Sequence, residues 1–167
     1  MSICNDNCIF RSEIAADREV LLILVMARIG LDEPQPEYLK CIIEIMKTKY
    51  FFSIMGGTPK KAHLFMKHHE GHFGFLDPHN TQKTVPFEHL AKAESEYTSK
   101  LRWIKEKEID SSMAIAFYVP SEKLDDFWED LSKKKAEMGE SFFIYMAEEK
   151  PELDENAEII ESLDDDF

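Results

Sequence analysis

The sequence predicts an α+β fold with a mainly antiparallel sheet flanked by helices. Three observations favour this class: apolar strand-like runs occur in separated groups, amphipathic helical patterns lie between the groups, and two runs are joined by a tight turn. With 167 residues, 44% of them hydrophobic, the chain is long and apolar enough for one domain with its own core.

The N-terminal segment carries a helical signal. Asp6 or Asn7 can cap a short helix, because both side chains accept hydrogen bonds from free backbone N–H groups. Ile9, Phe10 and Ile14 would then fall on one side of that helix. A short helix is therefore expected here.

The apolar run over residues 20–26 and the segment after it predict a strand followed by a helix. Periodicity alone leaves this run open between a helix and a buried strand. Its short length and the following Gly30 favour a central strand buried on both faces. Pro36 then opens a helix over residues 36–48, whose apolar positions keep the helical spacing: Leu39, Ile42, Ile43 and Met46.

The next segment reads as a strand, a loop and a hairpin. Residues 50–55 are strand-like, and the Gly-Gly-Thr-Pro sequence at 56–59 predicts a loop of special backbone geometry. Residues 62–67 and 72–76 form the two strands of a hairpin, with Glu70-Gly71 as its turn.

The second half repeats the strand–helix alternation. Residues 80–110 are polar, with a helix expected over 87–100, and a buried strand follows over 113–119. A helix then begins after Pro120, and residues 141–146 read as the last strand. The core stripe of that helix consists of Leu124, Phe127, Trp128 and Leu131.

Most of the negative charge lies in the C-terminal segment. Residues 147–167 hold ten acidic side chains and one lysine, out of a net charge of −13 for the chain. We expect a folded body over 1–146 and a disordered acidic tail over 147–167. The alternative is a tail that docks a partner around Ile159, Ile160 and Leu163. This charge argues against nucleic acid and anionic membranes as main partners.

Compartment signals point to the cytoplasm. No apolar run is long enough to span a membrane, and no basic, apolar leader opens the sequence. The chain has three cysteines, an odd number that fits a reducing compartment better than a disulfide framework.

Asp77-Pro78-His79 is the most informative triplet for chemistry. In an extended segment the side chains of Asp77 and His79 point to the same side, roughly 6.5–7 Å apart at Cα. A carboxylate that orients an imidazole is two-thirds of a nucleophilic triad. The same triplet is also an ordinary strand-ending turn, because aspartate and proline both favour turns.

The other histidines carry weaker signals. His68, His69 and His72, with Glu70 among them, look like a metal cluster. Their spacing is not that of a helical zinc motif, and the Glu-Gly turn favours a solvated loop. His63 is expected to be structural.

No cysteine has the setting of a nucleophile. Cys4 and Cys8 lack a second pair that would complete a zinc site, and Cys41 falls on the expected helix as a buried core thiol. None begins a helix after a glycine-rich turn, where the helix dipole would lower the thiol pKa.

Taken together, two motifs give the chain a family resemblance. Residues 52–63 carry Gly-Gly-x-Pro, and residues 75–82 carry Leu-Asp-Pro-His-x-x-Gln. With the segments 21–31, 36–48 and 112–118, this order resembles the autophagins over nearly all of the folded body. Autophagins are papain-like cysteine proteases that process the ubiquitin-like autophagy modifier.

The resemblance implies a fold, a reaction and a set of site residues. It implies the C-terminal part of a papain-like fold, with Asp77 and His79 as catalytic residues and Gly56, Gly57 and Pro59 in a loop that gates the substrate. The implied reaction is cleavage of the modifier after its C-terminal glycine, and release of the modifier from phosphatidylethanolamine. It implies no cofactor and no metal, with membrane contact only through the lipidated substrate.

The chain departs from the family at the nucleophile. The family's cysteine lies in a Trp-Gly-Cys segment, which this sequence lacks, and Cys4, Cys8 and Cys41 do not correspond to it. Three interpretations follow. The first is the C-terminal half of a protease whose nucleophile lies upstream, and the second is a pseudoprotease that binds the modifier without cutting it. An unrelated α+β domain with a chance match is the third.

Overall fold

The computed structural model assigns nine strands and two α-helices to the part of the chain that it describes. That part comprises residues 2–4, 7–14, 19–79, 84, 86, 87 and 101–151. The strands are β1 (Ser2–Cys4), β2 (Cys8–Phe10), β3 (Val20–Arg28), β4 (Phe51–Thr58), β5 (Lys61–His69), β6 (His72–Leu76), β7 (Arg102–Lys105), β8 (Ser112–Pro120) and β9 (Tyr145–Ala147). The helices are α1 (Pro36–Ile45) and α3 (Leu124–Met138), with single 3-10 turns η1 (Arg11–Glu13), η3 (Glu106–Glu108), η4 (Ser121–Lys123) and η5 (Gly139–Ser141).

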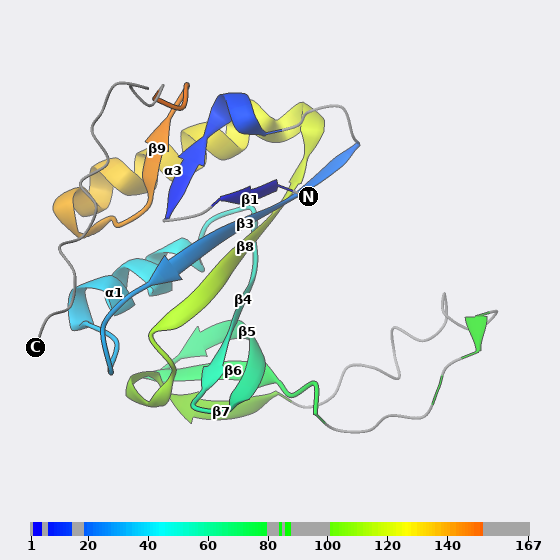
Figure 1. The fold of residues 1–167 in the computed structure, drawn as a ribbon, viewed down its shortest axis with the longest axis vertical. Coiled ribbons are helices and arrows are strands. Elements are labelled where there is room, and N and C mark those ends of the chain that lie inside the picture. The colour runs from blue at the N-terminus through cyan, green and yellow to red at the C-terminus, as the bar shows by residue number, and fades with distance from the viewer. Residues whose placement is uncertain are drawn as a thin grey trace, which may run out of the picture.

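Seven strands form one sheet in the order β1-β3-β8-β4-β5-β6-β7, and β2 pairs with β9 in a second, two-stranded sheet (Figure 1). In the large sheet only β1 and β3 run parallel, while the other five neighbouring pairs are antiparallel. The predicted α+β class with a mainly antiparallel sheet is therefore confirmed.

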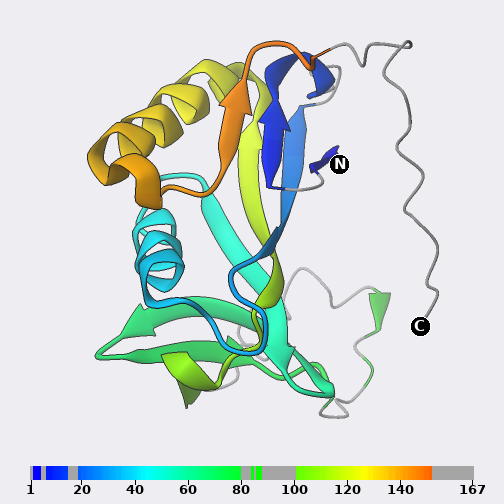
Figure 2. The same cartoon turned by 60° about the vertical axis from the view of Figure 1, so that its left-hand side comes forward.

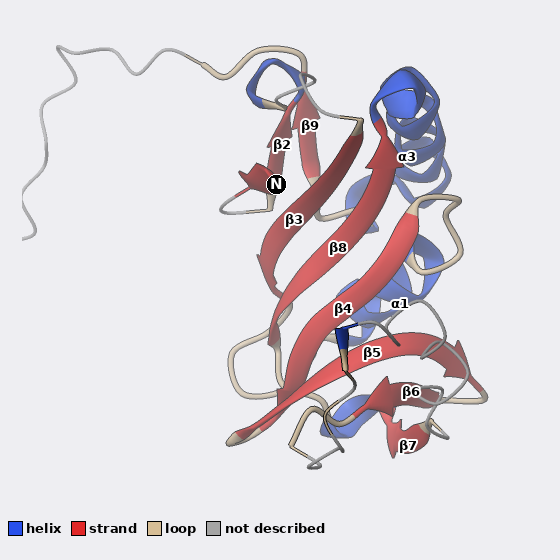
Figure 3. Ribbon diagram, turned by 90° about the vertical axis from the view of Figure 1, so that its right-hand side faces the viewer, coloured by secondary structure: helices blue, strands red, loops and turns tan. Residues whose placement is uncertain are grey.

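Both helices pack on one side of the sheet. Figures 2 and 3 show α1 and α3 on that side, with β4 and β8 running across the middle of the molecule. The core lies between these layers, where the Phe117 ring of β8 contacts the Phe127 ring of α3, with centroids 5.2 Å apart. Ile42 and Ile45 of α1 are completely buried against the same core.

The opposite face of the sheet exposes apolar side chains. Met26, Ala114 and Met55 lie opposite one another on β3, β8 and β4, and directly opposed residues of antiparallel strands share a face. We call the following set of exposed residues the outer face: Val20, Met26, Phe52, Met55 and Tyr118.

The strand predicted over 20–26 is present as β3, but its burial on both faces is wrong. Along β3 buried residues alternate with more exposed ones, from exposed Val20 and buried Leu21 to buried Val25 and exposed Met26. The alternation follows from the layers, because the helices cover only one side of the sheet.

The helix predicted near the N-terminus is also wrong. Residues 8–10 form β2, which pairs in parallel with β9, and only a 3-10 turn follows at Arg11–Glu13. Ile9 is completely buried, directly opposite Met146 of β9. Pairing with a strand more than 130 residues away thus overrides the local helical signal.

The β4–β5 connection corrects the predicted loop at 56–59. Gly56 and Gly57 belong to β4, where they pair with His63 and Ala62 of β5. Pro59 and Lys60 alone form the turn, and Lys60 has a φ of 72°. The proline suits the first central position of such a turn, and the left-handed residue occupies the second.

Most of the other predicted elements are confirmed, one is shorter than predicted, and one lies almost entirely outside the described residues. The helix over 36–48 is confirmed as α1, the hairpin as β5 and β6, the strand over 113–119 as β8 and the helix after Pro120 as η4 and α3. The strand predicted over 141–146 is shorter, since β9 begins only at Tyr145. The helix predicted over 87–100 lies outside the described residues, except for Phe87.

Sequence analysis missed β7, which continues the sheet beyond β6. Most of the predicted acidic tail, residues 152–167, is not described. The described start of that tail contacts η1: the Ser12 N–H donates to the Glu148 carbonyl, and Lys150 pairs with Glu13. Among the described helices, none has both the length and the apolarity to cross a membrane.

Candidate active site

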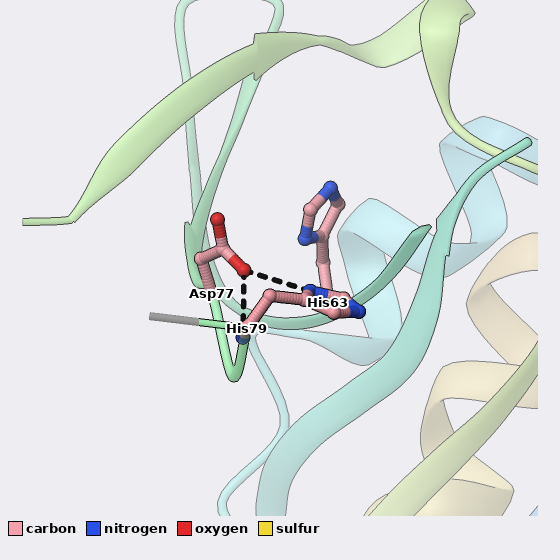
Figure 4. Close-up of side chains that lie close together, drawn as sticks. All are labelled: His63, Asp77 and His79. Carbon is pink, nitrogen blue, oxygen red and sulfur yellow. Dashed lines mark hydrogen bonds and ion pairs between the residues drawn. The ribbon is translucent and has the colours of Figure 1, made fainter. Parts of the chain in front are cut away.

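The end of β6 brings the two predicted catalytic residues beside β5 and β7. Leu76, the last residue of β6, pairs with Leu64 of β5, so Asp77 emerges next to His63. On the other side Phe75 pairs with Arg102 of β7. The β-ladder therefore brings together four polar side chains, one from β5, one from β7 and two from the segment that follows β6 (Figure 4 shows three of them).

Asp77 holds both the backbone and the side chain of His79. Its Oδ1 accepts the His79 backbone N–H at 3.0 Å and lies 2.9 Å from the ring Nδ1 of the same residue. Asp77 is 13% exposed and His79 54%. The carboxylate is thus fixed in the protein, while the imidazole faces outward.

The charge of Asp77 decides which nitrogen of His79 carries the proton. The pKa of Asp77 is lowered, first by the His79 backbone N–H, then by the His79 side chain and the charge of Arg102. At neutral pH the carboxylate is therefore ionised and can only accept hydrogen bonds. His79 must donate through Nδ1, which leaves Nε2 as a proton acceptor.

Arg102 is a site residue that sequence analysis missed. Its guanidinium donates to Asp77 Oδ2 over 2.9 Å, so both carboxylate oxygens have partners. The signal for it was weak, because Arg102 lies in a polar segment and reaches Asp77 only through the pairing of β6 with β7.

His63 was predicted to be structural, and it is buried, but it also lies against the site. The residue is 7% exposed. Its ring lies against that of Phe75 at a tilt of 38°, with centroids 4.2 Å apart, and meets the His79 ring at 6.3 Å and nearly at a right angle. Burial lowers the pKa of His63, although the nearby Asp77 charge raises it. The sequence did contain a signal that His63 is buried. It lies two residues before the core residue Phe65, and residues two apart in a strand lie on the same face.

Three side chains here could bind a metal ion. One atom each from His63, Asp77 and His79 lies within 4.8 Å of the other two. Among the described residues no other group of three or more histidine, cysteine or acidic side chains is as close.

None of the three cysteines belongs to this group. Cys4 lies in β1, Cys8 in β2 and Cys41 in α1, and none shares the cluster with His79. Burial raises the pKa of both Cys4 and Cys41 to about 11. A nucleophilic thiol requires the opposite shift, so neither of these two has the electrostatic setting of the catalytic nucleophile.

The predicted gating residues lie on the neighbouring hairpin. Gly56 and Gly57 line a groove of about 490 Å³ on the outer face of the sheet. Asp77 and His79 do not line that groove. Pro59 is exposed in the turn that follows.

The histidines of the β5–β6 hairpin are not a solvated loop, contrary to the prediction. His68 and His69 end β5 and His72 begins β6, with only Glu70-Gly71 in the turn. His68 is largely buried and lies 2.9 Å from Glu106 Oε2. The strands extend to the turn because Glu70 and Gly71 both adopt a positive φ, which matches the twist of a two-residue hairpin.

Comparison with known proteins identifies the family. Residues 2–134 match the model of the peptidase C54 catalytic domain. The chain is 32% identical to a probable cysteine protease atg4 of Sclerotinia sclerotiorum, over 87% of this chain and 35% of that protein. It is 26% identical to a probable cysteine protease atg4 of Schizosaccharomyces pombe, over 92% of this chain and 49% of that protein.

These relatives are longer than the chain, which spans 35% and 49% of their lengths. The match covers the seven-stranded sheet, α1 and most of α3. The architecture is accordingly that of a portion of the papain-like cysteine protease fold. The chain belongs to the peptidase C54 family, the autophagin cysteine proteases.

Proposed function

We propose that this chain forms part of a cytoplasmic cysteine protease that cleaves the ubiquitin-like autophagy modifier after its C-terminal glycine. The same site would release the modifier from phosphatidylethanolamine. His79 would take the proton from a cysteine thiol and later protonate the leaving amine, and Asp77 would hold the imidazole in the required tautomer.

The hydrogen bond between Asp77 Oδ1 and His79 Nδ1 carries this proposal. It leaves Nε2 as the base on an exposed ring, which a thiol and a substrate can approach. The His79 hydrogen bonds and, less strongly, the charge of Arg102 lower the pKa of Asp77. Arg102 also holds the carboxylate in place through its other oxygen. Family membership supports the choice of a thiol as the group that His79 would activate.

The hairpin beside the site fits a role in substrate entry. Pro59 lies in the exposed turn that directly follows β4, the strand whose Gly56 and Gly57 line the groove. Within this proposal the turn at Pro59 contacts the extended C-terminal tail of the modifier.

A non-catalytic modifier-binding role is the second candidate. It is favoured by one observation: no cysteine of this chain lies in the group formed by His63, Asp77 and His79. A protein that kept this site without a thiol would bind the modifier and leave its C-terminus intact.

An experiment on the endogenous protein would test both candidate functions. The protein would be captured with an antibody against this sequence, its intact mass measured, and its reaction followed with the modifier precursor and with a thiol-directed probe built on the modifier. The protease proposal expects a species heavier than the 19.5 kDa of this chain, which is labelled by the probe and cleaves the precursor.

The matched variant is His79→Ala at the genomic locus, with His69→Gln, a distant exposed histidine, as the control. His79→Ala should reduce cleavage at least 100-fold, because it removes the general base, and His69→Gln should leave cleavage unchanged. A 19.5 kDa species that binds the modifier without being labelled would overturn the protease proposal and support the second candidate.

A further inference from the structure

We propose that His63, Asp77 and His79 form a binding site for a divalent transition-metal ion of the Zn²⁺ type. The three side chains supply two imidazole nitrogens and one carboxylate oxygen, a ligand set typical of zinc and related metals. This property concerns the chain itself and does not depend on whether the protein is a protease.

The distances between the candidate ligand atoms are close to those found around a bound ion. Two atoms bound to one ion at 2.0–2.2 Å lie roughly 3–3.5 Å apart. Asp77 Oδ1 and His79 Nδ1 are already 2.9 Å apart, and the three candidate ligand atoms lie within 4.8 Å of one another. His79 is more than half exposed, so its ring can turn to close the remaining gap.

A second observation points to a missing ligand. His63 is more than nine-tenths buried. Its Nδ1 atom is also buried and has no hydrogen-bond partner. Figure 4 shows a ring nitrogen of His63 on the side that faces Asp77. A buried polar atom without a partner is costly, and coordination to a metal would satisfy it.

The surroundings also hold the other ligands in place. Arg102 donates to Asp77 Oδ2, and the His79 backbone N–H donates to Oδ1. Such outer contacts orient a ligating carboxylate. For a metal to bind Nδ1 of His79, the proton that this nitrogen shares with Asp77 would move to Nε2, and the imidazole would stay neutral. Three protein ligands leave a position for water, as in exchangeable sites.

The competing metal site on the described surface is the pair formed by His69 and His72. These residues lie directly opposite each other across the β5–β6 turn, and exposed histidine pairs also capture transition metals. They offer two ligands rather than three. The experiment must therefore separate the two sites.

The test is titration of the purified chain with Zn²⁺ by calorimetry, and with Co²⁺ by its visible ligand-field absorption. We expect one ion per chain. His79→Ala and Asp77→Asn change residues at the edge of the core and should each weaken binding at least tenfold. His63→Phe should do the same, because the aromatic neighbours Phe65 and Phe75 can accommodate a phenyl ring. The double variant His69→Gln/His72→Gln should bind as the wild type does.

Absence of binding at millimolar Zn²⁺ would overturn the proposal. So would binding that is unaffected by His79→Ala, or binding that disappears in the His69→Gln/His72→Gln variant. Circular dichroism and the melting temperature establish that each variant is folded.

If the protease proposal holds as well, the metal would block Nε2 or Nδ1 of the general base and inhibit cleavage reversibly. Failure of that inhibition would leave the binding result untouched.

Discussion

At the scale of single residues, His63 makes the folded chain sensitive to mild acid. Burial lowers its pKa below the ordinary value of 6.5, so the folded state resists protonation while the unfolded chain takes up a proton below about pH 6.5. Stability from the neutral ring is therefore fully present above that pH and is lost as the pH falls through 6.5 toward the lower folded value.

We expect the free energy of unfolding of the wild type to fall more steeply between pH 7.5 and 5 than that of His63→Phe. Asp77 does not contribute in this window, because its pKa lies below the ordinary carboxyl value of 3.8. Urea unfolding followed by tryptophan fluorescence in EDTA measures both proteins free of metal. His69→Gln, which removes an exposed histidine, should keep the wild-type slope. Parallel pH profiles for wild type and His63→Phe would refute the argument.

The site residues differ in how far the sequence could predict them. Asp77 and His79 are two positions apart, so local geometry and a family motif were enough to single them out. Arg102 and His63 reach the site only because β7 and β5 pair on either side of β6. Strand order is set by long-range packing, which the local pattern does not contain.

At the scale of elements, the two glycines of β4 have different roles, although the Gly-Gly-Thr-Pro pattern and the family resemblance both placed them in a loop. A Cβ on Gly57 would lie 2.0 Å from the backbone carbonyl oxygen of Lys61. A Cβ on Gly56 would meet only side chains, with Phe65 nearest at 3.2 Å. The β4–β5 ladder therefore requires glycine at 57 for close backbone approach.

Gly57→Ala should destabilise the chain by roughly 2–3 kcal/mol, because β4 and β5 must separate to admit a methyl group. Gly56→Ala, the neighbouring control, should change stability by less than about 1 kcal/mol, since Phe65 can shift and alanine restricts the unfolded chain. Chemical denaturation measures both. Equal, small effects would mean that the hairpin yields easily, as a gating loop would.

Elements were predictable where local chemistry and packing agree. The α1 helix begins at Pro36 and carries a regular apolar stripe, and the β5–β6 turn places Gly71 at a φ of 74°, so both were found. The β2 segment was predicted to be a helix because three apolar residues fit a helix as well as a strand. The short β7 was overlooked because its residues are mostly exposed, with Trp103 packing over Gly74 rather than in the core.

At the scale of the whole molecule, the outer face of the sheet is the main unpartnered apolar surface among the described residues. Phe52 and Tyr118 lie with ring centroids 6.3 Å apart and are each about half exposed. Met26 and Met55 continue the surface along β3 and β4. Contiguous apolar area of this kind favours association in water.

We expect the purified chain to self-associate through this face, and more strongly at high salt. The net charge of −13 opposes the approach of two copies, and salt screens that repulsion while leaving apolar contacts intact. Sedimentation velocity at low and high salt would follow the change. The double variant Met26→Lys/Phe52→Lys should sediment as a 19.5 kDa monomer in both conditions. Leu31→Lys removes an even more exposed apolar side chain outside the strands and should associate as the wild type does. A wild-type monomer at every salt concentration would contradict the argument, because exposure of these side chains would then carry no measurable cost.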